Sequence, residues 1–291
     1  MDFGRAFAVG IGLNLAYVAL EAGYGLAAGS LALLADAGHN LGDVLGLALS
    51  WGAAALGRRG PSTRFTYGLR SSTILAALAN ALILLVVTGG IAWEAVWRLR
   101  YPVPVTGGLV AAVAAVGIAV NGVTALLFAR GRGSDLNIRS AFLHMAADAL
   151  VTAGVVAAGL AILLTGFSWL DPAVSLIVSA VIVYGAWDLV KQALSLALDA
   201  VPQGVDAAAV RTHLLALPGV AALHDLHIWG MSTTETALTC HLVMPGGHPG
   251  DAALSHITEE LEHRFGIHHA TIQIEVGDSE AECALTPEHV V

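Results

Sequence analysis

Residues 73–97 read TILAALANALILLVVTGGIAWEAVW, an almost uninterrupted apolar run with one charged residue, Glu94. A helix needs about 20 apolar residues to cross the hydrocarbon core of a bilayer. This run is long enough for one crossing, and the single charge lies close to its end. The sequence therefore predicts a transmembrane helix over residues 73–97.

The whole chain shares this apolar character. Its 291 residues are 56% hydrophobic and 12% charged, and their mean hydropathy is +0.74. Soluble domains carry about 25% charged residues, so an entirely soluble chain is excluded. The net charge of -9 argues against nucleic-acid binding, which needs a basic surface. Two cysteines are too few for a disulfide framework or a cysteine-built zinc module.

Apolar segments that could cross a bilayer recur through the first two thirds of the chain. Clusters of glycine, proline and polar residues separate them. We predict six transmembrane helices, near residues 7–28, 35–56, 73–97, 109–129, 141–165 and 173–194. The first segment is too long for a signal peptide and leads directly into further spans.

A change in composition marks a boundary after the sixth segment. Residues 1–198 hold 9 of the 22 acidic residues and 2 of the 12 histidines, and residues 199–291 hold the others. Residues 201–204, which read VPQG, would end the preceding helix. We predict a transmembrane domain over 1–198 and an acidic, histidine-rich domain over 199–291 that is long enough to form its own core.

The arginines predict the orientation of the bundle. The connections after the second and fourth segments carry seven arginines, and the connections on the other side carry two. Because basic loops stay in the cytoplasm, we expect both termini and the domain 199–291 to be cytoplasmic.

Two histidines in the apolar domain each precede an aspartate by four residues. His39 and Asp43 lie in the second segment, and His144 and Asp148 lie in the fifth. Residues four apart share one face of a helix. Two imidazoles and two carboxylates form a four-ligand set that suits tetrahedral Zn²⁺, and the carboxylates neutralise its charge. The alternative is that each pair is a structural hydrogen bond; ionisable groups within a membrane favour a function instead.

Five other polar residues of the apolar domain have predicted roles of their own. Asp36 shares the His39 face near the start of the segment, where helix capping is its expected role. Asn14 and Glu21 share one face of the first segment and could form a polar pathway. Asn80 and Asn121 are expected to hydrogen-bond between helices.

The chain resembles the cation diffusion facilitator family. Four stretches carry the resemblance: residues 29–40, reading GSLALLADAGHN, with Asp43; residues 135–144, reading DLNIRSAFLH, with Asp148; Asp171-Pro172; and residues 224–229, reading HDLHIW. The resemblance implies a homodimeric six-helix exporter that exchanges cytoplasmic divalent metal for protons, with His39, Asp43, His144 and Asp148 as the transport site. A histidine in both pairs implies zinc as the main substrate.

Two loops depart from patterns found in that family. Residues 64–68, reading RFTYG, lack the histidine of an additional metal site that some relatives carry. Residues 131–134 lack the histidine-rich loop of many eukaryotic relatives. The short loop favours a bacterial inner-membrane protein.

The pattern after residue 199 predicts a helix over 206–216, strands over 220–229 and 234–244, a helix over 250–265 and a strand over 269–276. Alternation buries Leu238, Cys240, Leu242 and Met244 in one strand, and Ile272, Ile274 and Val276 in the last. This αββαβ order resembles the small α+β, metallochaperone-like domain of the family. The resemblance implies a cytoplasmic metal site at His224, His241 and His256 with Glu275. The family's final His-x-Asp reads Gln273-x-Glu275 here, so an amide replaces one imidazole. The alternative is that these histidines are simply solvated on an acidic surface.

The resulting hypothesis is a proton-coupled exporter of divalent cations, chiefly Zn²⁺, which is the transported substrate and a possible regulatory ligand. It is not an enzyme, since an intramembrane metalloprotease would need a His-Glu-x-x-His motif and the sequence has none. Its partners are metal ions, protons, the lipid bilayer and a second copy of the chain, without nucleic acid. The alternative is a membrane-bound metal sensor that does not transport.

Overall fold

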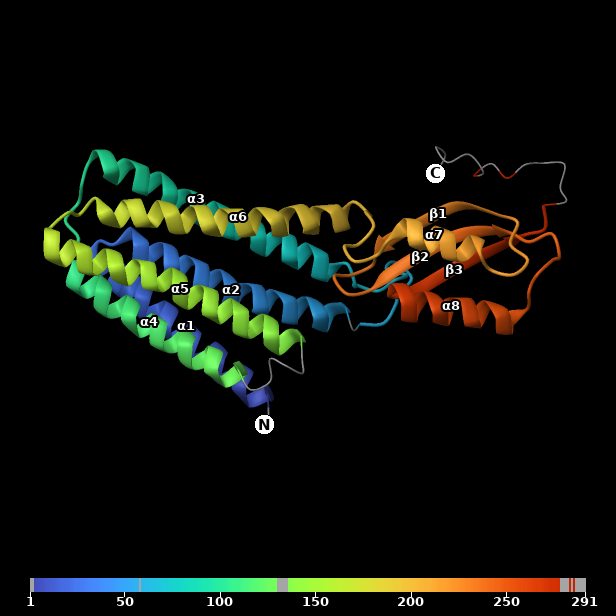
Figure 1. Cartoon of the computed structure of the whole chain (residues 1–291), viewed down its shortest axis with the longest axis horizontal. Coiled ribbons are helices and arrows are strands. Elements are labelled where there is room, and N and C mark those ends of the chain that lie inside the picture. The colour runs from blue at the N-terminus through green and yellow to red at the C-terminus, as the bar shows by residue number, and fades with distance from the viewer. Residues whose placement is uncertain (1–2, 58, 130–135, 278–282, 284, 286–291) are drawn as a thin grey trace. The chain divides into compact units, whose positions relative to one another are not determined.

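The computed structural model describes residues 3–57, 59–129 and 136–277, together with Cys283 and Leu285 (Figure 1). The chain divides into two compact units. The first comprises residues 1–49 and 79–189, and the second comprises residues 50–78 and 190–291. Each unit has a hydrophobic core of its own.

Six long helices occupy the predicted positions: α1 (Phe3–Ala28), α2 (Leu31–Gly57), α3 (Ser72–Arg100), α4 (Gly107–Ala129), α5 (Leu136–Thr165) and α6 (Leu170–Ala197). Within the described residues, four of them, α3 to α6, combine the length and the apolar composition needed to cross a membrane. Helices α1 and α2 contain 26 and 27 residues, which also suffice in length. The prediction of a helical membrane domain is confirmed.

Glycine allows α4 and α5 to pack with their backbones in contact. A Cβ atom added at Gly159 would lie 2.6 Å from the backbone nitrogen of Ala111, and one added at Gly107 would lie 2.6 Å from the carbonyl oxygen of Gly159. Small residues give this close approach between membrane helices. Beside this contact, the buried side chains of Leu33, Val110 and Val155 belong to the core of the first unit.

Asp171 caps a helix other than its own. Gly29 turns the chain between α1 and α2 with φ +66°. At the start of α2, the Leu31 backbone N–H donates to Asp171 Oδ2 at 2.7 Å, and the Ser30 hydroxyl donates to Asp171 Oδ1. Ser30 Oγ in turn accepts from the Leu33 N–H at 3.2 Å. These contacts satisfy N–H groups that the first turn of α2 leaves without intrahelical partners.

The second unit contains the predicted αββαβ domain: α7 (Ala207–Leu215), β1 (Ala222–Gly230), β2 (Thr236–Val243), α8 (Asp251–Phe265) and β3 (Ile267–Glu275). Strand β2 is central; it pairs antiparallel with β1 and parallel with β3. The parallel pair needs a crossover, which α8 provides.

The core of this domain lies between the sheet and its two helices. Leu214 of α7 and Leu261 of α8 pack with Leu238 and Leu242 of β2, and all four are fully buried. The predicted inward face of β2 is therefore confirmed. In the last strand, the predicted burial of Val276 was wrong. β3 ends at Glu275, and Val276, which follows it, is 41% exposed.

Candidate metal sites

His39, Asp43 and Asp148 converge in the first unit. The His39 Nε2 atom lies 3.2 Å from Asp148 Oδ1 and 3.8 Å from Asp43 Oδ2. One ligand atom from each residue falls within 4.8 Å of the others. A single cation could therefore contact all three side chains.

Two helices supply these ligands. His39 and Asp43 are one turn apart on α2, so they face the same side. Asp148 comes from α5, 109 residues away from His39 in the sequence, and its side chain is buried. His144 lies one turn before Asp148 on α5, but its side chain is outside the described part of the chain. Its role as the fourth ligand stays a prediction.

Asp36 lies behind this cluster and is not a helix cap, so that prediction was wrong. It lies inside α2 with a fully buried side chain. The Thr152 hydroxyl donates to Asp36 Oδ2 at 2.9 Å and also lies 2.9 Å from the backbone carbonyl of Asp148. Capping is instead performed by Ser30 and Asp171. Thr152 thus connects Asp36 to the turn of α5 that carries the candidate ligand Asp148.

Glu21 on α1 belongs to the same polar region. The Tyr17 hydroxyl donates to Glu21 Oε1 at 2.8 Å, and the Asn40 amide donates to Glu21 Oε2 at 3.5 Å. Asn40 also donates to the Asp36 carbonyl at 3.0 Å. Tyr17, Glu21 and Asn40 are all buried. The sequence indicated Glu21 as a polar residue of the first helix, but not these contacts.

The hydrogen bonds expected of Asn80 and Asn121 are not found among the described residues. Asn121 on α4 is fully buried, and neither its amide nitrogen nor its oxygen has a hydrogen-bond partner among the described residues. The Asn80 side-chain oxygen likewise has no partner there. The prediction that Asn121 hydrogen-bonds between helices is therefore not supported.

A second cluster lies on the sheet of the second unit. It comprises His224, His241, Glu275 and Cys283, whose ligand atoms fall within 4.8 Å of one another. His224 on β1 and His241 on β2 are directly paired in the strand register. Glu275 Oε1 lies 2.9 Å from His241 Nδ1, and Glu275 Oε2 lies 3.3 Å from His224 Nε2. Cys283 Sγ lies 3.8 Å from His241 Nδ1.

A bulge in β1 positions this second cluster. Between His224 and His227 the pairing with β2 shifts, and Asp225 adopts φ +51°. Asp225 is thereby directed toward two histidines: Oδ1 lies 2.8 Å from His227 Nε2, and Oδ2 lies 3.4 Å from His241 Nε2. Bulges commonly redirect side chains next to functional sites.

His256 does not join this cluster. It lies on α8 with a side chain that is 72% exposed, 3.8 Å from Glu260 one turn later. The sequence therefore identified three members, His224, His241 and Glu275, and included one residue that the single chain places elsewhere. For Cys283 the sequence left two readings open, a spare thiolate ligand or no role, because a residue after the last strand has no periodicity that would orient it.

The two titratable groups with altered pKa values in this domain differ in environment. Partial burial favours the neutral form of Glu275, but hydrogen bonds from Gln273 and Cys283 and the nearby imidazoles lower its pKa below the ordinary value. Burial raises the pKa of the Cys240 thiol to about 12. Glu275 is therefore ionised and ready to bind a cation at neutral pH, whereas Cys240 remains a core thiol.

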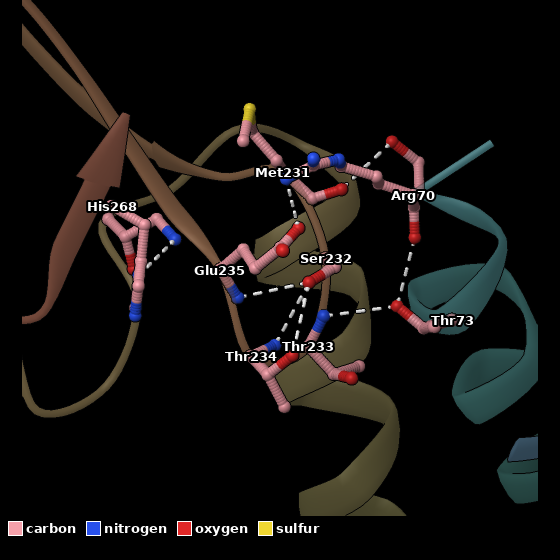
Figure 2. Close-up of polar contacts among 10 residues, drawn as sticks. Arg70, Thr73, Met231, Ser232, Thr233, Thr234, Glu235 and His268 are labelled. Atoms are coloured by element: carbon pink, nitrogen blue, oxygen red, sulfur yellow. Dashed lines mark hydrogen bonds and ion pairs between the residues drawn. The ribbon is translucent and has the colours of Figure 1, made fainter. Parts of the chain in front are cut away.

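The turn between β1 and β2 contacts the segment before α3. Figure 2 shows Arg70 and Thr73 facing the turn of residues 231–235. Arg70 Nη1 lies 2.6 Å from Glu235 Oε2, and the Thr233 N–H donates to Thr73 Oγ1 at 3.1 Å. Residues of this turn also line a cavity of about 570 Å³. Because the ion pair is well exposed, it contributes only about 0–1 kcal/mol.

The first unit is a helical membrane bundle in which a histidine and two carboxylates are placed so that they could hold a metal ion, and a small α+β domain follows it. The chain belongs to the cation efflux family. Residues 7–196 match the cation efflux transmembrane domain, and residues 202–276 match the cytoplasmic domain of cation efflux proteins. The resemblance to cation diffusion facilitators is therefore confirmed, and the chain is a multi-pass membrane transporter and not an enzyme.

Similar proteins are known from several bacteria. The chain is 34% identical to the metal cation efflux system protein CzcD of Cupriavidus metallidurans, over 95% of this chain and 88% of that protein. It is 36% identical to the zinc transporter ZitB of Escherichia coli, over 93% of this chain and 87% of that protein. It is 32% identical to the cadmium, cobalt and zinc/H(+)-K(+) antiporter of Bacillus subtilis, over 89% of this chain and 85% of that protein.

Proposed function

We propose that the chain exports divalent cations, chiefly Zn²⁺, from the cytoplasm in exchange for protons. The observation that carries this proposal is the convergence of His39, Asp43 and Asp148 from two helices of the membrane bundle. Ionisable side chains are rare within membranes and usually belong to a transport or binding site. The names of the relatives agree with zinc as a substrate and with an antiport mechanism.

The chemistry of the ligands favours Zn²⁺. His39 and His144 would supply nitrogen, and Asp43 and Asp148 would supply oxygen and two negative charges. A four-coordinate nitrogen and oxygen site suits Zn²⁺, whereas Mg²⁺ and Ca²⁺ prefer more oxygen ligands. The two carboxylates compensate the charge of the ion in a region of low dielectric constant.

Metal binding at such a site is coupled to protons because the ligands must be deprotonated to bind. The cation would enter from the cytoplasm and displace protons. After the bundle opens to the opposite side, protons would displace the cation. Protons thus return to the cytoplasm as metal leaves.

The expected setting is a bacterial inner membrane, with both termini cytoplasmic. The excess of arginine in the connections after the second and fourth helices supports this orientation. The division into a transmembrane domain over residues 1–198 and a cytoplasmic domain over residues 199–291 remains a prediction.

The cytoplasmic cluster is proposed as a regulatory metal site. His224, His241, Glu275 and Cys283 offer two nitrogens, one oxygen and one sulfur, a set that suits Zn²⁺ or a softer ion such as Cd²⁺. The chain is proposed to act as a homodimer. Metal bound to this acidic domain would reduce repulsion between two copies.

Transport by the purified full chain in proteoliposomes tests the proposal. Addition of Zn²⁺ on one side should cause metal uptake together with proton movement in the opposite direction. Liposomes without protein are the control, and Co²⁺, Cd²⁺ and Mn²⁺ added separately define the selectivity. A metal sensor that does not transport would bind Zn²⁺ but produce neither flux.

A further inference from the structure

A pair of carboxyl groups lies inside the bundle, apart from the candidate metal ligands. Glu21 is on α1 and Asp36 is on α2, and the side chains of both are fully buried. The two carboxyl groups are within hydrogen-bonding contact of each other. Neither residue is a member of the His39 cluster.

The surroundings of this pair are polar but hold no positive counterpart. Tyr17 and Asn40 donate to the two oxygens of Glu21, and Thr152 donates to Asp36 Oδ2. Asp36 Oδ1 receives no donor from any side chain that the structure describes. Among those residues, neither carboxyl group forms an ion pair with lysine or arginine.

This arrangement requires a proton. Two ionised carboxylates contain no hydrogen, so their contact becomes a hydrogen bond only when one of them is protonated. Two negative charges placed together in a buried site are costly, and sharing one proton relieves the repulsion. Asp36 Oδ1, which receives no donor from a described side chain, has lone pairs available to accept a shared proton.

The pair is close enough to the metal cluster to respond to the charge of a cation. The other described titratable groups around it are Tyr17, His39 and Asp148. Asp36 lies one turn before His39 on α2, and the Thr152 hydroxyl lies within hydrogen-bonding distance of both Asp36 and the Asp148 carbonyl. A divalent cation near His39 would stabilise a second negative charge on the pair.

We infer that the Glu21–Asp36 pair is a proton-carrying site of this exporter, separate from the metal ligands. With the metal site empty, the two carboxyl groups share one proton. When the cation binds, the O–H bond breaks, the proton leaves to solution, and both groups remain as carboxylates. On release of the cation, one proton binds again. This inference rests on the proposed exchange of metal for protons.

The interface of α1 with α4 extends the polar region beyond Glu21. The Tyr17 hydroxyl packs against Gly117, where an added Cβ atom would lie 2.1 Å away. Asn121, one turn further along α4, is fully buried. A side chain at position 117 would therefore require the Tyr17 ring to move.

Glu21→Gln in the full chain tests the inference in proteoliposomes. Glutamine keeps the size and polarity of the side chain but carries no transferable proton. Zn²⁺ binding and exchange of metal for metal without a pH gradient should persist. The number of protons moved per metal should fall by one. With a difference of one pH unit across the membrane, each coupled proton can support about a tenfold ratio between the metal concentrations on the two sides. Loss of one coupled proton should therefore lower the largest attainable ratio about tenfold.

Matched variants separate this result from a general defect. Glu94→Gln makes the same change on α3, where Glu94 pairs with Arg98, and should keep the wild-type ratio. Glu21→Asp retains a carboxyl group and should recover coupling in part. If Glu21→Gln does not bind Zn²⁺, Asp36→Asn provides the same measurement from the other half of the pair.

The possible outcomes are distinct. A wild-type proton-to-metal ratio in Glu21→Gln, or in Asp36→Asn where that variant is needed, would overturn the inference and leave the antiport intact. If the wild-type chain moves metal without any protons, the proposed exchange itself fails. A ratio reduced by one in Glu21→Gln but not in Glu94→Gln supports the carboxyl pair.

Discussion

The two candidate metal sites of the molecule are built in different ways from similar residues. In the membrane bundle, His39 and Asp43 come from one helix and Asp148 from another, and helical spacing aligns the residues of each helix. In the αββαβ domain, the candidate ligands come from three strands and from Cys283 beyond the last strand. A helical site therefore leaves a short sequence signature, whereas a sheet site depends on strand register, a bulge and the path of the chain after the last strand.

The largest effect is expected at the bundle cluster. Asp148→Ala removes one of two carboxylates that compensate the cation, so Zn²⁺ uptake into proteoliposomes should fall to the level of empty liposomes. Asp188→Ala removes an exposed carboxylate from α6 and should retain most of the uptake. Substantial transport by Asp148→Ala would mean that the convergence of these helices is not the transport site.

A double variant tests whether the histidines of the helical site determine its selectivity. His39→Asp with His144→Asp replaces both nitrogen ligands by carboxylates, which suit harder ions better. The preference for Zn²⁺ over Mn²⁺ should decrease on the order of tenfold, a typical effect of altering a metal environment. Competition between the two ions in the uptake assay measures it. An unchanged preference would assign the histidines a structural role.

The next effect concerns the sulfur ligand of the cytoplasmic cluster. Cys283→Ser should weaken Cd²⁺ binding to this domain about tenfold, because a hydroxyl is a poor replacement for a thiolate. Thiol alkylation of the full chain gives a second measurement. Cd²⁺ should protect Cys283, while Cys240 stays unreactive with or without metal because burial raises its pKa to about 12. Equal alkylation of Cys283 with and without Cd²⁺ would remove it from the site.

The smallest effect is expected at the bulge in β1. Asp225→Asn keeps a residue that tolerates positive φ, whereas Asp225→Ala loses both this tolerance and the contacts to His227 and His241. Alanine should weaken metal binding to the cytoplasmic cluster by less than about tenfold, and asparagine by less than alanine. Titration of the full chain with the transport site disabled by Asp148→Ala would measure both. Equal affinities in the two variants would show that the bulge does not position His241.

Local patterns were sufficient for much of the fold. Apolar runs identified all six long helices, and alternation in residues 236–243 identified the buried face of β2, because both patterns repeat within one element. Val276 departed from its expected burial because the strand ends before it. Position 256 was selected by resemblance alone, and its helix α8 leaves the side chain exposed.

The sequence was enough to locate the helical spans and the αββαβ order, and to predict His39–Asp43 and His144–Asp148 as pairs on one helix face, since these features depend on periodicity over a few residues. Tertiary structure alone decided that Asp171 caps α2, that Asp36 contacts Glu21, and that Cys283 reaches His241. These contacts join segments that are 15 to about 140 residues apart in the sequence. Their physical basis is the packing of separate elements, which no local repeat encodes.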